Sequence, residues 1–135
     1  MTNPKTNMMK KQLLFFIFLF AAFVSNSGCK KTANEITCYL NTMPTQPPVE
    51  MNIVYTATQT GDGTIATLSY VTNGGTVTVQ NPQLPWTITI PVLSSTFVSI
   101  SAVGTTKNGS LKIKYEGSSG TSSIEGSDYC EQQTN

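Results

Sequence analysis

The chain has 135 residues, of which 39% are hydrophobic and 11% charged, with 8 basic and 7 acidic side chains and no histidine. This length fits one domain whose core can fold alone. The near-neutral charge argues against a nucleic-acid partner, because such binders carry a strongly basic surface. The absence of histidine removes the commonest proton shuttle at neutral pH and the commonest zinc ligand.

Residues 1–28 have the organisation of an export signal peptide. Three lysines and no acidic residue precede an uncharged apolar run from Leu13 to Val24. As a helix this run would extend about 18 Å, which is short of the ~30 Å hydrocarbon core of a bilayer. We therefore interpret it as the apolar region of a cleaved signal, followed by small residues that suit a signal peptidase.

Cys29 follows these small residues directly, and this arrangement resembles the bacterial lipoprotein signal. In that family the cysteine thiol receives a diacylglycerol, and cleavage leaves the cysteine first. Ser27 and Gly28 match the pattern, whereas Asn26 stands where an aliphatic residue is usual. We expect Cys29 to hold the chain in membrane lipid, since two or more acyl chains give lasting attachment. The alternatives are an ordinary cleaved signal that leaves a free thiol, or a retained membrane helix.

Residues 29–50 are predicted to form the lipidated N-terminus and a tether. The segment has a polar start and three prolines between residues 41 and 49. This composition is typical of an extended spacer. Lys30 and Lys31 either contact anionic head groups or are simply solvated.

Residues 51–135 are predicted to form the folded domain. Apolar and polar residues alternate through six or seven short segments, and turn residues separate these segments. Period-two alternation gives each strand one apolar face. We expect an all-β fold, an immunoglobulin-like antiparallel β-sandwich of about seven strands behind the lipoprotein leader. Asn108 and Gly109 form a pair typical of a tight hairpin turn.

The segment around Trp86 is flanked by Pro82, Pro85 and Pro91. Proline cannot donate a hydrogen bond to a sheet, so this segment is predicted to be an edge strand or one entered through a bend. Trp86, the only tryptophan, is interpreted as a core anchor between the sheets, with a ligand platform as the alternative.

Cys38 and Cys130 remain once Cys29 is assigned to lipid. An exported chain with two cysteines most simply forms one disulfide. This bond would close a long loop, which the loop-entropy model values at about 4 to 5 kcal/mol. Two distant cysteines are too few for a metal site, and Cys130 has no histidine to activate it as a nucleophile.

The acidic residues form no catalytic pattern. Asp62 stands between two glycines, which favours a simple turn over a calcium-binding loop. No two carboxylates share a predicted strand face across the core, as glycoside hydrolysis requires. We therefore expect a binding or scaffold protein that is not an enzyme and uses no cofactor and no metal.

The stretch from Tyr55 to Cys130 resembles the MmpS family, the small accessory membrane proteins of mycobacteria and their relatives. The most specific match is Leu84-Pro85-Trp86-Thr87, which is similar to the family's L-P-W-S/T motif. The flanking matches to the family's strand and turn patterns are Ile53 to Tyr55, Gly61 to Gly63, Leu68 to Tyr70, Asn73 to Gly75, Val98 to Ala102 and Ile113 to Gly117.

The resemblance implies an accessory subunit of resistance-nodulation-division type transporters that export lipids or siderophores, and it implies no catalytic residues. Two features depart from the family. Leu111 stands where family members often place a cysteine that pairs with the terminal one. The family also uses a transmembrane helix, where this chain is expected to use a lipid on Cys29.

A free-standing immunoglobulin-like envelope or surface lipoprotein that binds a glycan or a protein is the alternative function. A structural envelope lipoprotein without a specific ligand is a third. In each case we expect a location in the cell envelope, outside the cytoplasm. The periplasmic side is favoured over the cell surface, because no acidic run follows Cys29.

Overall fold

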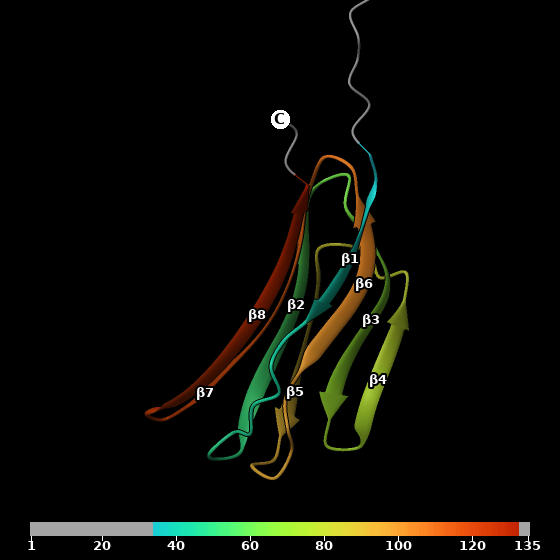
Figure 1. The fold of residues 1–135 in the computed structure, drawn as a ribbon. Coiled ribbons are helices and arrows are strands. Elements are labelled where there is room, and N and C mark those ends of the chain that lie inside the picture. The colour runs from blue at the N-terminus through green and yellow to red at the C-terminus, as the bar shows by residue number, and fades with distance from the viewer. Residues whose placement is uncertain (1–33, 133–135) are drawn as a thin grey trace, which may run out of the picture. The chain divides into compact units, whose positions relative to one another are not determined.

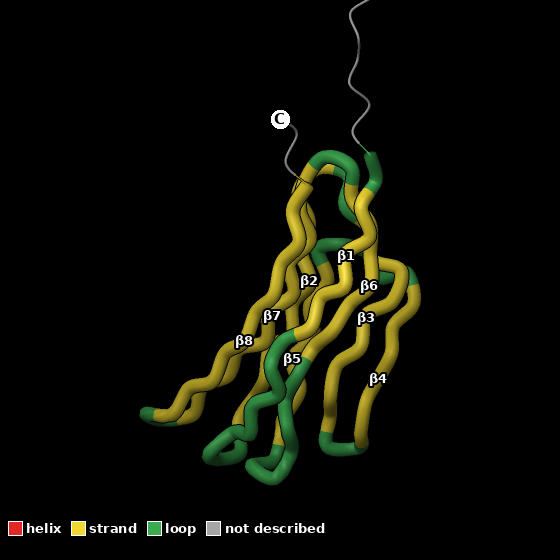
Figure 2. The backbone as a smooth tube through the Cα atoms, viewed as in Figure 1, coloured by secondary structure: helices red, strands yellow, loops and turns green. Residues whose placement is uncertain are grey.

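The computed structural model describes residues 34–132, which form eight strands and contain no helix. Figure 1 shows the strands arranged in two layers, and Figure 2 shows the short loops that join them. The strands are β1 (Ile36–Asn41), β2 (Met51–Gly61), β3 (Thr64–Thr72), β4 (Gly75–Gln80), β5 (Trp86–Val92), β6 (Ile100–Thr106), β7 (Gly109–Ser119) and β8 (Ser122–Gln132).

Two four-stranded antiparallel sheets make up the fold. The first has the order β1-β6-β3-β4 and the second has the order β5-β2-β7-β8. The prediction of an all-β sandwich is therefore confirmed, with eight strands where about seven were expected. The position of β5 at the edge of its sheet also agrees with the prolines that flank it.

The additional strand, β1, lies in the segment that the sequence assigned to a tether. It pairs antiparallel with β6, with Ile36 opposite Thr106 and Asn41 opposite Ser101. Cys38 and Leu40 on its inner face are buried. The folded domain thus begins well before residue 51. Six alternating residues beside a proline-rich loop were too weak a signal to separate from a spacer.

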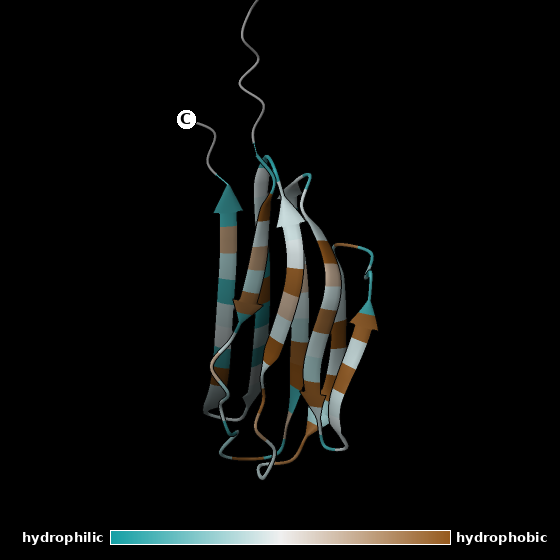
Figure 3. Ribbon diagram, turned by 45° about the vertical axis from the view of Figure 1, so that its right-hand side comes forward, coloured by the Kyte–Doolittle hydropathy of each residue, from teal (hydrophilic) through white to brown (hydrophobic). Residues whose placement is uncertain are grey.

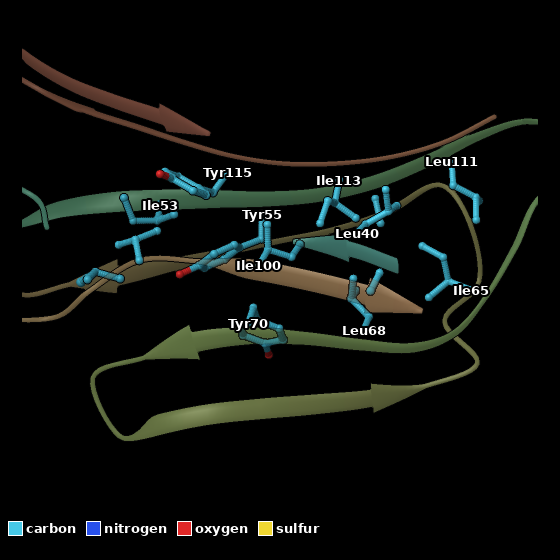
Figure 4. Close-up of a cluster of buried hydrophobic side chains, with 14 of the residues drawn as sticks. Leu40, Ile53, Tyr55, Ile65, Leu68, Tyr70, Ile100, Leu111, Ile113 and Tyr115 are labelled. Atoms are coloured by element: carbon cyan, nitrogen blue, oxygen red, sulfur yellow. The ribbon is translucent and has the colours of Figure 1, made fainter. Parts of the chain in front are cut away.

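The core fills the space between the two inner faces. Figure 3 shows brown apolar bands alternating with paler polar ones along the strands, as period-two patterning requires. Figure 4 shows side chains from both sheets meeting in this layer, among them the fully buried Tyr55, Leu68 and Ile113. Burying each such side chain contributes about 1.5–3 kcal/mol relative to its exposure.

The Asn108-Gly109 connection differs from its prediction. It joins β6 to β7, which belong to different sheets, so it crosses between the layers and is not a hairpin turn. Gly109 has a φ of 146°, and a Cβ there would lie 2.1 Å from the carbonyl oxygen of Thr60. The Asn108-Gly109 pair correctly indicated a backbone conformation that favours glycine. It could not show that the strands on its two sides belong to different sheets.

A disulfide joins Cys38 to Cys130, with the two Cα atoms 5.8 Å apart, which confirms the expected pairing. Cys38 lies on β1 and Cys130 on β8, and each strand is the edge of its own sheet. Beside this bond, the backbone N–H of Asn41 donates to Oδ2 of Asp128 at 2.8 Å. One side of the sandwich is therefore closed by a covalent and a polar link.

The double substitution Cys38→Ala/Cys130→Ala should lower the free energy of unfolding by about 4 kcal/mol, because it releases a long loop in the unfolded chain. Urea denaturation followed by tryptophan fluorescence measures this change. Reduction of the native protein is the matched control and should cause a loss of similar size, whereas the double variant should not respond to reductant. An unchanged midpoint in both cases would contradict the stabilising role.

Candidate functional site

Cys29, the expected lipidation site, lies outside the described residues, as does the whole leader. The lipid anchor therefore stays a prediction. Within residues 34–132 there is no helix with the length and apolar character needed to span a membrane.

The Leu84-Pro85-Trp86 motif lies where the chain enters β5. The side chains of Leu84 and Trp86 are half-buried and pack against the core from its edge. The Trp86 ring lies 5.4 Å from the ring of Tyr70, which in turn lies 5.2 Å from the ring of Tyr55. Trp86 thus continues an aromatic row outward from the centre of the sandwich.

The Leu84–Pro85 peptide bond is cis. Beside it lies a depression of about 330 Å³, lined in part by Gln59, Asn81 and Gln83. The motif therefore presents one face to the core and borders a polar surface with the other.

Asp62 stabilises the crossover between β6 and β7. Its Oδ1 atom accepts hydrogen bonds from the backbone N–H groups of Lys107 at 2.9 Å and Asn108 at 3.0 Å, and from the hydroxyl of Thr106 at 3.0 Å. The bonds from Asn108 and Lys107 favour the ionised form and lower the pKa of Asp62 to about 2. This arrangement is turn chemistry, and the carboxylate is used within the fold.

Several charged side chains lie together on the outer faces of β7 and β8, among them Lys114, Glu116 and Glu125. Glu116 and Glu125 lie opposite each other, and Lys114 contacts both, at 4.0 Å in the case of Glu125. The contact with Glu116 raises the pKa of Lys114. An open groove of about 530 Å³ runs beside this trio and is also lined by Asn52, Val54, Ser118 and Ser123.

No set of three Cys, Asp or Glu residues within residues 34–132 is arranged to hold a metal ion. The groove offers carboxylate, hydroxyl and amide groups, which can hydrogen-bond to a polar ligand. The carboxylates of Glu116 and Glu125 in this groove both contact the ammonium group of Lys114.

A second surface, which sequence reasoning missed, lies at the end of the sandwich where β1 and β5 finish. We call it the loop end and define it as the β1–β2 loop (residues 42–50) and the β5–β6 loop (residues 93–99). Figure 1 shows these two loops side by side. Met43 is 84% exposed and Phe97 is 57% exposed, and Leu93 and Val49 are exposed as well.

The loop end is held in place by buried polar side chains. The hydroxyl of Tyr115 lies 3.0 Å from the carbonyl oxygen of Met43 and 2.7 Å from Oγ1 of Thr45. The backbones of Thr45 and Val98 exchange two hydrogen bonds, at 3.0 and 2.8 Å. The apolar side chains are therefore displayed on an ordered platform.

The turn between β3 and β4 supports the second loop. Nδ2 of Asn73 donates to the carbonyl of Pro91 at 3.1 Å, and its Oδ1 accepts from the N–H of Leu93 at 2.9 Å. In the sequence, the loop end is marked only by apolar residues within Pro- and Ser-rich stretches. This pattern does not show whether such a side chain is buried or exposed.

Comparison of the chain with protein-family models, with curated proteins and with solved structures found no match.

The stabilising contribution of Asp62 should depend on pH. Because its folded pKa of about 2 lies below the ordinary value, the contribution is present above about pH 4 and is lost as the pH falls through 2. The urea midpoint of the native protein should therefore exceed that of Asp62→Ala at pH 6 and converge toward it near pH 2. A matched Glu50→Ala variant should show no such convergence. A pH-independent difference for Asp62→Ala would contradict this role.

Proposed function

We propose that this chain is a non-catalytic binding module, held outside the cytoplasm by lipid on Cys29. The observation that carries the proposal is the disulfide between Cys38 and Cys130. Disulfides form and persist in oxidising compartments and are rare in the cytosol. The bond thus agrees with an export leader over residues 1–28, although the leader is known only from its sequence.

The direction of the strands supports a tethered module. β1 begins and β8 ends at the same end of the sandwich, and the loop end lies at the other (Figure 1). A chain held through its N-terminus would enter the domain at the first end and present Met43 and Phe97 at the second. Exposed Met and Phe side chains on a surface with few charges are typical of protein interfaces.

The polar groups of the sandwich support a binding role over a catalytic one. The carboxylate of Asp62 accepts a hydrogen bond from the backbone of the β6–β7 crossover, and that of Asp128 accepts one from the backbone of β1. The carboxylates of Glu116 and Glu125 both contact Lys114. Each is engaged in a structural contact, and none stands beside a nucleophile with a base to activate it.

The narrower form of the proposal is an accessory subunit of a resistance-nodulation-division type exporter. It rests on the resemblance of Leu84-Pro85-Trp86-Thr87 and the neighbouring strands to the MmpS family. The transporter would then be the partner, contacted by the loop end.

The alternative is a free-standing envelope module of immunoglobulin-like type. The groove beside Glu116 and Glu125 favours it, because carboxylate, hydroxyl and amide groups suit the hydroxyls of a glycan. In that case the ligand would be bound on the outer face of β7 and β8 and not at the loop end.

Substituting Cys29→Ala should abolish incorporation of radiolabelled fatty acid, because it removes the thiol that would be acylated. The labelled wild-type chain should partition with membranes, and the variant should accumulate as precursor or appear in the soluble fraction. Ser27→Ala is the matched control, since alanine preserves the small side chain before the cysteine. Equal labelling of Cys29→Ala and wild type would refute the anchor.

The binding surface can be identified by crosslinking in intact cells, followed by purification from detergent extracts. Under the narrower proposal the wild-type chain recovers an export transporter. The double variant Met43→Glu/Phe97→Glu should recover little of this transporter, because the substitutions place charge on the apolar side chains of the loop end. Thr89→Glu, on the exposed outer face of β5, is the matched control and should retain the partner. Recovery of no membrane protein, together with digestion by protease added to intact cells, would instead support the free-standing module.

A further inference from the structure

The two sides of the sandwich are protected differently. On one side the edge strands β1 and β8 are joined by the Cys38–Cys130 disulfide. β8 also carries Glu125, Asp128 and Glu131 along its length. Charges on an edge strand discourage pairing with another chain. On the other side lie the edge strands β4 and β5, which no disulfide joins.

Neither strand of this second side carries a charge. The sequence has no Asp, Glu, Lys or Arg between Asp62 and Lys107, a stretch that contains β3, β4, β5 and β6. β5 has Pro91 within it and Pro85 just before it, and both limit hydrogen bonding along its edge. β4 contains no proline, so it lacks both common forms of edge protection.

β4 is also the most exposed strand of its sheet. Five of its six residues are exposed, and Val77 on its inner face keeps 38% of its surface accessible. Among the strands of residues 34–132, β4 pairs with β3 alone. The free edge of β4 thus combines unpaired backbone groups with an incompletely covered apolar side chain.

The hydrogen-bond pattern shows which backbone groups face outward. The N–H of Asn81, directly after β4, donates to the carbonyl of Ala66 at 2.8 Å and so points toward β3. Successive residues of a strand direct their N–H groups to opposite sides. The N–H and C=O groups of Thr76, Thr78 and Gln80 therefore point away from β3, toward the free edge.

We propose that β4 pairs antiparallel with β4 of a second copy of this chain, about a two-fold axis at Thr78. In this register Thr78 lies opposite its own counterpart, and Thr76 lies opposite Gln80. Antiparallel hydrogen-bonded pairs exchange two bonds each, so the three pairs supply about six hydrogen bonds. The two sheets then become one continuous eight-stranded sheet across the pair.

The side chains suit this register as well. Val77 of each copy lies opposite Val79 of the other, so apolar residues stay on the inner face and Thr and Gln stay on the outer face. A second copy suits this edge because its own β4 is uncharged, so that pairing the two β4 strands brings no charged side chain into the contact. Self-pairing through β8 would instead place carboxylates near carboxylates. The pairing does not depend on the lipid anchor, since β4 lies within the folded domain.

The register is tested by single cysteines in the full-length chain, expressed in cells that export it and oxidised in their membranes. Thr78→Cys should form a covalent dimer on non-reducing gels, because paired Cα atoms at about 5.5 Å fit disulfide geometry. Thr76→Cys alone should not, since its counterpart would lie about 14 Å along the strand. Co-expression of Thr76→Cys with Gln80→Cys should restore the dimer.

Two controls keep the result interpretable. Thr37→Cys places a thiol on the exposed outer face of β1, the opposite edge of the same sheet, and should give no dimer. In the co-expression experiment, Thr78→Lys is added to both the Thr76→Cys chain and the Gln80→Cys chain. This change should abolish the crosslink, because two lysines then lie opposite each other at the two-fold axis. Mass analysis should show the Cys38–Cys130 bond intact in every variant.

Equal crosslinking of Thr76→Cys and Thr78→Cys would overturn the proposal, because it would indicate random collision and not a register. Absence of the Thr78→Cys dimer, with the native disulfide intact, would overturn it too. A crosslink from Thr78→Cys to a different protein only would show that the edge accepts a foreign strand, which also overturns pairing with a second copy.

Discussion

The covalent link between the edge strands β1 and β8 is the constraint on which the rest of the structure depends. It fixes the two sheets to each other on one side and joins residues 92 positions apart. It also recruits β1, a strand of six residues with only two buried apolar side chains, Cys38 and Leu40, into the core. The sandwich consequently has a closed side and an open side, and the chain enters and leaves at the same end.

Hydrogen bonds of two buried tyrosine hydroxyls and of the exposed Asp62 carboxylate then fix a strand end and two of the connections. Tyr55 donates to the carbonyl of Val71 at 2.6 Å, and burial raises the pKa of this tyrosine, so its hydroxyl remains a donor. Tyr115 holds the β1–β2 loop in the same way. Asp62 holds the β6–β7 crossover through its ionised carboxylate. These side chains supply hydrogen-bond partners to backbone groups near the end of β3 and in the connections.

The distribution of charge gives the two layers different surfaces. Lys112, Lys114, Glu116, Glu125 and Glu131 lie on β7 and β8. The neighbouring sheet presents mainly Thr, Ser and apolar residues, including Tyr39, which is 78% exposed. A protein that binds through an uncharged surface avoids the cost of desolvating ions. The free edge of β4 belongs to this uncharged part of the domain, and the loop end carries a single charged residue, Glu50.

The sequence by itself determined the class of fold, because period-two alternation can bury one face of each strand only in a layered sheet. It also predicted the Cys38–Cys130 pair, on the expectation that Cys29 carries lipid, and it offered an edge position for β5 as one of two interpretations of the prolines that flank this strand. It did not determine that residues 36–41 form a strand, because six residues carry too little periodicity.

Only the tertiary structure decided which strands are neighbours. The glycine at 109 signalled its backbone geometry locally, but whether the chain turns back or crosses to the other sheet depends on packing between distant segments. For the same reason, the exposure of Met43 and Phe97 and the free edge of β4 could not be read from the chain. Apolar residues look alike in sequence whether a neighbouring sheet covers them or not, and that covering is set by contacts far apart along the chain.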